Sequence, residues 1–285
     1  MRQTAECTLL AAKKGSRMPD VIELVRPREG VALVTMTNPE IRNHGSAAAI
    51  GELASALREA RVGGSRVTVL ASGVPGHWFE HAWLTDVANM VDGQPMSGDP
   101  TGWFHTLREL AHPEVVSIAA VSGDCTGGGA ELGWACDLRI AEEQATFGQP
   151  EVMIGLATGI GGTSRLMRLI GRTATAEMVF DGAPMTAQRI YELGGLNRVV
   201  PTGEAINASL AWASRLADRP AKSLEMLKRM LDGSEQLPLK DALANEQKLF
   251  QEVARTPEAL ERMREIQARF DAGETIRDIY GNPRK

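Results

Sequence analysis

The sequence predicts an α/β fold in which short buried strands alternate with helices, followed by a helical C-terminal region. Apolar runs rich in β-branched residues, at residues 31–36, 67–71 and 115–121, are typical of buried strands. Residues 47–60 instead place their apolar side chains on one helical face. Past residue 220 the strand-like runs stop, and apolar and charged faces alternate as in packed helices.

Taken in order, the chain begins with residues 1–19, which mix charge, Gly and Ser without periodicity and predict a flexible arm. A hairpin is expected next, with strands at residues 21–25 and 31–36 joined by a turn. The remaining expected elements are the helix 47–60, the strand 67–71, helical pieces between 86 and 111, the strand 115–121, helices at 160–169, 173–180, 186–193 and 205–216, and C-terminal helices at 223–231, 240–253 and 257–270.

A glycine-rich stretch lies at the centre of the sequence. The strand expected at residues 115–121 is predicted to run straight into Gly127, Gly128 and Gly129, and a helix is expected at residues 130–136. Backbone N–H groups at a helix N-terminus lack intrahelical partners and stabilise an anion. Glu131 follows on the first turn and Glu151 comes twenty positions later (151 − 131). Two carboxylates beside an anion site indicate acid–base chemistry next to a carbonyl group.

Composition limits the classes of partner and compartment. The 285 residues predict one main domain with an appended element, and the net charge of −5 argues against nucleic acid or an anionic membrane as partner. Cys7, Cys125 and Cys136 show no pairing pattern, which predicts free thiols in a reducing compartment. No run approaches the ~18 apolar residues that span a bilayer, and residues 8–12 are too short for a signal sequence. We therefore expect a soluble, cytoplasmic protein.

Four competing motifs fail on spacing or on residue type. The dinucleotide fingerprint Gly-x-Gly-x-x-Gly is broken by Leu132 in one candidate and by Ser164 in another. Neither a P-loop ending nor a Gly-x-Ser-x-Gly elbow occurs. His77 and His81 have i, i+4 spacing, but no HExxH string surrounds them, so no metal site is expected.

The strings GGGAELGWACDLRIA, FGQPEVMIGLATGIGGTSRL and GAPMTAQRIYELGGLNRVV resemble the signature run of the crotonase superfamily, the enoyl-CoA hydratase/isomerase family. The resemblance extends from about residue 21 to about residue 216. It implies a crotonase-like spiral of ββα units over residues 20–216, which would contain the active site. It also implies that the helices of residues 217–285 build a homotrimer or a dimer of trimers.

The same resemblance assigns roles to individual residues. Glu131 and Glu151 would hold a water molecule and add it across the 2,3-double bond of a 2-enoyl-CoA. The backbone N–H groups of Gly128 and Trp83 would form the oxyanion hole for the thioester oxygen. The remaining expected substrate-binding residues are His81, Ala82, Gly127, Gly129, Trp103 and Gly159. Coenzyme A would enter as part of the substrate, and no separate cofactor or metal is expected.

One segment departs from the family pattern. Family members usually carry a Phe-x-x-Gly-Ala-Asp-like string where this sequence has Phe-Glu-His-Ala-Trp-Leu at residues 79–84. Ala82 thus replaces a glycine, Trp83 adds a bulky ring near the acyl pocket, and His81 adds an imidazole ring. A backbone donor needs no particular side chain, so the oxyanion hole can survive these changes.

Other interpretations stay open at this stage. The chain fits an enoyl-CoA isomerase, or a specialised acyl-thioester lyase or hydratase of secondary metabolism. It also fits an acyl-CoA-binding pseudoenzyme whose pocket is blocked by Trp83. Asp137 and Arg165 match family positions, but structural pairing is the simpler expectation for both. The acyl chain length, and the choice between CoA and a carrier protein, do not follow from the sequence.

Overall fold

The computed structural model describes residues 21–281 and contains two sheets. The expected N-terminal arm, residues 1–19, lies outside this range. The larger sheet has the order β1-β2-β3-β5-β7-β10 and contains β1 (Ile22–Arg28), β2 (Val31–Met36), β3 (Val67–Ser72), β5 (Val116–Val121), β7 (Leu138–Glu142) and β10 (Arg198–Val200). The smaller sheet has the order β4-β6-β8-β9 and contains β4 (Gly76–His77), β6 (Gly123–Thr126), β8 (Thr146–Gly148) and β9 (Met185–Thr186).

Successive pairs of strands along the chain add one strand to each sheet. β3 is followed by β4, β5 by β6 and β7 by β8, and the first member of each pair joins the larger sheet while the second joins the smaller one. Helices follow each pair. The expected α/β spiral of ββα units is therefore confirmed. One local expectation was wrong: β5 ends at Val121, and the separate short strand β6, not β5, leads into the glycines.

The hairpin β1–β2 is confirmed as antiparallel, but its turn is shorter than expected. β1 continues to Arg28, with a register irregularity between Val25 and Arg28. Pro27 fits this position because β1 is an edge strand and proline cannot donate a ladder hydrogen bond.

Both faces of the larger sheet are covered by helices, which explains its continuous apolar runs. All six residues of β3 are buried, and its side chains alternate between the two faces. Val67 and Val69 pack with Ala213 of α7 (Ala205–Ala217), whereas Leu70 packs with Leu53 of α1 (Ala47–Val62).

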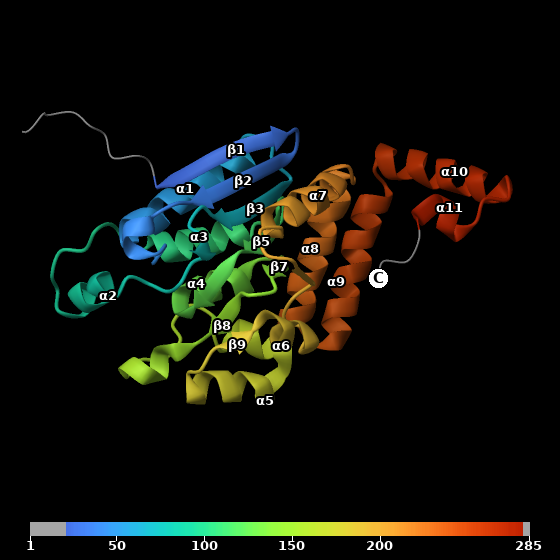
Figure 1. The fold of residues 1–285 in the computed structure, drawn as a ribbon. Helices are drawn as coiled ribbons and strands as arrows, with labels where there is room; N and C mark the ends of the chain where they lie inside the picture. The colour runs from blue at the N-terminus through green and yellow to red at the C-terminus, as the bar shows by residue number, and fades with distance from the viewer. Residues whose placement is uncertain (1–20, 282–285) are drawn as a thin grey trace, which may run out of the picture.

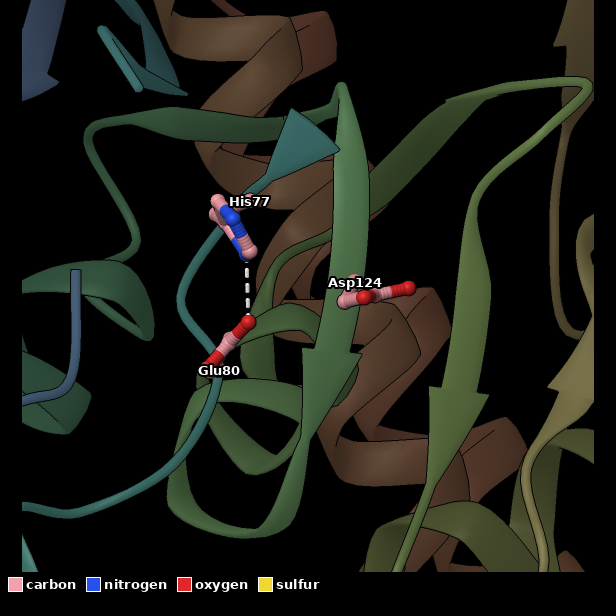
Figure 2. A group of neighbouring side chains, drawn as sticks. All are labelled: His77, Glu80 and Asp124. Carbon is pink, nitrogen blue, oxygen red and sulfur yellow. Dashed lines mark hydrogen bonds and ion pairs between the residues drawn. The ribbon is translucent and has the colours of Figure 1, made fainter. Parts of the chain in front are cut away.

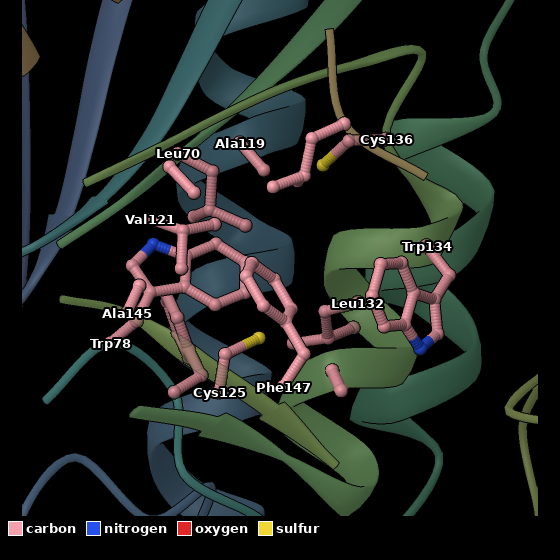
Figure 3. Close-up of a cluster of buried hydrophobic side chains, with 14 of the residues drawn as sticks. Leu70, Trp78, Ala119, Val121, Cys125, Leu132, Trp134, Cys136, Ala145 and Phe147 are labelled. Atoms are coloured by element: carbon pink, nitrogen blue, oxygen red, sulfur yellow. The ribbon is translucent and has the colours of Figure 1, made fainter. Parts of the chain in front are cut away.

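The core on the α1 side continues into the smaller sheet (Figure 3). Trp78 and Phe147 are fully buried there, with Leu132 of α4 (Gly127–Ala135) beside them. Cys125 and Cys136 lie in the same cluster as free thiols. This buried cluster packs against α4, directly after the glycine turn.

The remaining helices lie around this core, and the C-terminal ones extend to the side of the molecule opposite α2 (Figure 1). They are α2 (Leu84–Val91), α3 (Gly102–Leu110), α5 (Ser164–Asp181), α6 (Ala187–Glu192), α8 (Ala221–Gln236), α9 (Leu239–Ala254), α10 (Pro257–Asp271) and α11 (Ile276–Tyr280). The helices expected at 160–169 and 173–180 together form α5, which begins at Ser164 and is interrupted at Gly171, where the backbone leaves the helical conformation (φ 77°, ψ 164°). Among the described residues, none of these helices has the length and apolar character needed to cross a membrane.

A buried lysine joins the C-terminal helices to the core. Lys228 of α8 is 4% exposed, and its Nζ donates to the Leu110 carbonyl (2.7 Å), the Val115 carbonyl (2.8 Å) and Asp137 Oδ2 (2.8 Å). The Ser117 N–H and hydroxyl also donate to Asp137 Oδ2, at 2.7 and 2.9 Å. The structural role expected for Asp137 is therefore confirmed.

Lys228→Met should destabilise the protein by about 3–5 kcal/mol, because it leaves a carboxylate and two carbonyls without their shared cation. The free energy of unfolding in urea measures this loss. Lys240→Met, on the exposed surface of α9, is the matched control and should change stability by less than about 0.5 kcal/mol. A loss below about 1 kcal/mol for Lys228→Met would contradict the anchoring role.

Candidate active site

A cavity of about 590 Å³ lies where α4, the segment 79–83 and the loop 150–160 meet. Its walls are mainly apolar, with Trp103 packed across Gly45 and Gly128. Nine of the residues expected from the sequence line this cavity: His81, Ala82, Trp83, Trp103, Gly127, Gly128, Glu131, Glu151 and Gly159. The fold therefore brings together residues that are far apart in sequence.

Gly129 is the expected site residue that does not line the cavity. A Cβ at this position would lie 1.8 Å from the Phe79 carbonyl oxygen, so the glycine allows α4 to pack directly on the backbone of residue 79. Gly127 has φ of 49°, a left-handed conformation that favours glycine. The first two glycines thus face the cavity, and the third fixes the helix in place.

Glu131 lies deep in the site, 3% exposed. Its Oε1 accepts hydrogen bonds from the N–H groups of Ile160 (2.9 Å) and Gly162 (2.6 Å). Burial raises the pKa of Glu131 above its ordinary value, and these backbone donors partly offset that rise. Glu131 therefore faces the cavity wall rather than solvent. The expected first-turn position was wrong, because α4 begins at Gly127 and Glu131 is its fifth residue.

Glu151 stands at the start of the 3₁₀ helix Pro150–Ile154 and is held by the buried Gln149. With its amide nitrogen toward Glu151, Gln149 donates to Oε1 (2.9 Å) and Oε2 (3.2 Å), and its oxygen accepts from Trp134 Nε1 at 3.0 Å. This orientation is assigned from the hydrogen-bond network. Burial raises the pKa of Glu151, a hydrogen bond to its own backbone lowers it, and the charge of Glu131 raises it further.

The raised pKa of Glu131 carries a cost in stability that depends on pH. Below the ordinary pKa range of a carboxyl group, Glu131 is protonated in both the folded and the unfolded state, so its raised pKa does not lower the free energy of unfolding. As pH rises through the folded pKa, ionisation favours the unfolded state. Glu131→Gln should therefore gain stability relative to the parent protein as pH rises from 5 to 8, measured by urea unfolding. Glu143→Gln, on the exposed surface, is the control. This account would be contradicted if the stability of Glu131→Gln relative to the parent protein fell as pH rises.

The Trp83 N–H is not free to bind an oxyanion in this structure. It donates to the Gly45 carbonyl at 3.0 Å, while the Gly45 N–H donates to the His81 carbonyl at 2.7 Å. These two bonds pair Gly45 with Ala82 in a parallel bridge. In an extended segment successive N–H groups point to opposite sides, so the Ala82 N–H points away from Gly45.

Two unpaired N–H groups meet at the cavity instead. Among the described residues, neither the Ala82 nor the Gly128 N–H has a hydrogen-bond acceptor. The Ala82 nitrogen lies 3.4 Å from the position a Cβ on Gly128 would take. Gly128 stands in the first turn of α4, where backbone donors are unpaired and the helix dipole is positive. The pairing of residue 82 with residue 45 thus shifts the available donor from Trp83 to Ala82.

A strained loop supports this bridge. Arg42 and Asn43 have φ of 50° and 54°, a left-handed conformation uncommon for residues other than glycine. The buried Asn43 side chain holds the loop, because its Nδ2 donates to the Met36 carbonyl (3.0 Å) and to Ser72 Oγ (2.6 Å). Its Oδ1 accepts from the Asn38 N–H at 2.6 Å. Gly45 is thereby held opposite Ala82.

Polar side chains gather behind the segment 79–83. Glu80 Oε2 lies 2.6 Å from His44 Nε2, and Glu80 Oε1 bonds His77 Nδ1 (Figure 2). His77, Glu80 and Asp124 offer ligand atoms within 4.8 Å of one another. However, His77 and Glu80 already bond each other, and Asp124 Oδ1 accepts from the Thr146 hydroxyl at 2.7 Å. The His77–Glu80 bond and the Thr146–Asp124 bond therefore account for the arrangement of these three side chains.

Sequence reasoning missed Gln149, Asn43, His44 and Glu80 as supporting residues. A signal existed for Gln149, since it directly precedes Pro150 and Glu151 in the motif. His44 and Glu80 are 36 positions apart, and only the fold brings them together. Arg165 has the structural role expected for it, since its Nη1 donates to the Ile160 carbonyl at 2.6 Å.

Comparisons with known proteins agree with this architecture. The profile of the enoyl-CoA hydratase/isomerase family matches residues 26–268. A 2,3-dehydroadipyl-CoA hydratase of Escherichia coli is 30% identical over 82% of this chain and 90% of its own length. A probable mitochondrial enoyl-CoA hydratase of Dictyostelium discoideum is 30% identical over 77% of this chain and 78% of its own. The crystal structure of an enoyl-CoA hydratase subunit from Geobacillus kaustophilus, 29% identical, superimposes with a TM-score of 0.77 over 90% of this chain and 96% of that one.

Proposed function

Because the chain belongs to the enoyl-CoA hydratase/isomerase family and is a hydro-lyase enzyme, we propose that it adds water across the 2,3-double bond of a 2-enoyl-CoA thioester. The single observation that carries this proposal is the meeting of Glu131, Glu151 and two unpaired backbone N–H groups in one apolar cavity. Coenzyme A would enter as part of the substrate, with no separate cofactor.

The two N–H groups supply electrostatic stabilisation. When water attacks Cβ of an enoyl thioester, negative charge moves through Cα onto the thioester oxygen. Donors at Gly128 and Ala82 would bind that oxygen as the charge develops, and they need no reorganisation because the fold already fixes them. The dipole of α4 acts in the same direction.

The two glutamates supply the acid and the base. One carboxylate removes a proton from water as its oxygen bonds to Cβ, and the other carboxyl group delivers a proton to Cα as the π bond breaks. Burial raises the pKa of both carboxyl groups, and the charge of Glu131 raises the pKa of Glu151 further, a direction that suits the group that delivers a proton. Two glutamates in the cavity support hydration over isomerisation, which in family members can proceed with the second glutamate alone.

The cavity favours an apolar acyl group. Leu84, Val87, Met90 and Phe104 form one wall, and Met153, Ile154 and Leu156 line it from the loop after Glu151. The described lining includes no lysine or arginine that would pair with a carboxylated acyl chain. Trp83 is part of the wall of an open cavity of about 590 Å³, which argues against a pocket blocked by its ring.

Loss of enoyl-thioester absorbance tests this proposal. Purified protein should consume crotonyl-CoA and longer 2-enoyl-CoA substrates, with kcat/KM rising with chain length until the cavity is filled. The same substrates on the pantetheine arm of a carrier protein distinguish the two thiol carriers. If no 2-enoyl thioester is consumed while acyl-CoA still binds, the protein is an acyl-CoA-binding pseudoenzyme.

We also propose that the C-terminal helices assemble the protein into a homotrimer or a dimer of trimers. α8 to α11 expose large apolar side chains that a partner copy would cover: Leu227, Leu231, Leu239, Leu243, Phe250, Leu260, Met263, Ile276 and Tyr280. Light scattering measures the mass directly.

The free thiols of Cys125 and Cys136 support the predicted cytoplasmic location.

A further inference from the structure

The structure contains one polar side chain at the reacting end of the cavity that the mechanism above does not use. His81 lines the cavity. A Cβ built on Gly127 would lie 3.0 Å from the His81 Cβ and 3.5 Å from Glu151 Oε1, so His81 and Glu151 approach the same point. The backbone end of the His81 side chain therefore lies near Glu151, on the Gly127 side of the cavity.

The hydrogen bonding of the His81 ring fixes its tautomer. Nδ1 lies 2.6 Å from the Ala82 carbonyl oxygen, which can only accept, so Nδ1 carries a hydrogen. In the neutral imidazole, Nε2 then has a free lone pair. No described residue forms a hydrogen bond with Nε2.

The His81 ring packs against a neighbouring side chain that is itself fixed by hydrogen bonds. His44 stacks on His81 with ring centroids 4.1 Å apart and an interplanar angle of 26°. His44 is fixed in turn by Glu80, and the Glu80 carbonyl accepts from the N–H (2.7 Å) and hydroxyl (2.6 Å) of Thr126. Burial lowers the pKa of His44 first, and the neighbouring His81 lowers it further, while Glu80 opposes both.

Some of the other polar groups around the cavity already have hydrogen-bond partners. Asp86 is occupied, because its carboxylate accepts from the N–H of Ala47 (2.7 Å) and the N–H of Ser97 (2.7 Å). Glu131 already accepts two backbone N–H groups on Oε1. His81 thus offers an acceptor without a described partner on the wall of the cavity that holds Glu131 and Glu151.

We propose that His81 is a third substrate-contacting residue, whose Nε2 accepts a hydrogen bond from the hydroxyl group on Cβ of the 3-hydroxyacyl thioester. In the hydration direction it would orient the attacking water in the same way. His81 takes no proton in this step, because Glu131 and Glu151 still exchange the protons with Cα and with water. The inference rests on the proposed function for its choice of ligand.

A pair of variants separates this role from a structural one. The amide of His81→Gln places an acceptor near the position of Nε2, whereas the amide of His81→Asn reaches only the position of Nδ1 and keeps the bond to the Ala82 carbonyl. Binding of 3-hydroxybutyryl-CoA and of butyryl-CoA is measured by calorimetry on the whole protein. His105→Gln, on the exposed surface of α3, is the control.

The parent protein should bind the hydroxylated thioester more tightly than the saturated one. His81→Asn should reduce that preference about three- to tenfold, whereas His81→Gln and the control should keep it within about twofold. The inference is overturned if His81→Asn keeps the preference, if His81→Gln loses it as fully as His81→Asn does, or if the parent shows no preference. Because binding needs no turnover, failure of the hydratase proposal would be seen separately, in the absorbance assay.

Discussion

Glu131→Gln and Glu151→Gln should each lower kcat for hydration about 10²–10⁴-fold while leaving the binding of a saturated acyl-CoA nearly unchanged. Each substitution keeps the shape of the side chain and removes its ability to exchange a proton. Glu131→Gln also keeps an oxygen that can accept the N–H groups of Ile160 and Gly162, so the loop should stay in place. Steady-state rates together with calorimetric binding measure the two effects.

The exposed Glu143→Gln serves as the control for this pair and should turn over at the parental rate. If Glu131→Gln kept more than a tenth of the activity while Glu151→Gln lost it, one glutamate would suffice. That pattern would favour double-bond isomerisation over hydration.

Removal of the Ala82 N–H should cost about 10²–10³ in kcat, the usual loss for one oxyanion donor. Replacement of residue 82 by lactic acid turns its amide into an ester, which deletes the N–H and keeps the methyl side chain. The change also makes the His81 carbonyl an ester carbonyl, which accepts the Gly45 N–H bond more weakly, whereas the Trp83 N–H to Gly45 bond stays intact.

The matched control is the same ester replacement at residue 83, with the α-hydroxy analogue of tryptophan. It removes a structural hydrogen bond to Gly45, so it should reduce stability by about 1 kcal/mol with a much smaller loss of kcat. If the ester at residue 83 proved the more damaging to kcat, the oxyanion donor would be Trp83. The bridge to Gly45 would then have to open in the reactive complex.

Much of the fold follows from local pattern. The strands β2, β3 and β5 are apolar runs covered on both faces, and α1 carries a one-sided apolar pattern, so each is recognisable within its own segment. β6 is four residues long and is defined by its pairing in the smaller sheet. Such a short strand has no periodicity to detect, and for that reason the bend after β5 was not predicted.

Some features of the cavity could likewise be predicted from the sequence, and others could not. Glu131, Glu151, Gly127 and Gly128 lie in a motif whose order and spacing predict their convergence, and all four line the cavity, whereas Gly129 does not. The direction of the Trp83 N–H could not be predicted, because it depends on pairing with Gly45, 38 positions earlier in the chain (83 − 45). The stack of His44 on His81 also depends on contacts that only the folded chain creates.

The product of a reaction run in deuterated water tests the central claim most directly. Hydration of crotonyl-CoA should give 3-hydroxybutyryl-CoA with one deuterium on Cα, visible by NMR, since the Cα proton comes from a solvent-exchanged carboxyl group and the Cβ hydroxyl from water. A product with the double bond moved to the 3,4-position and no hydroxyl group would contradict hydration and identify the enzyme as an isomerase.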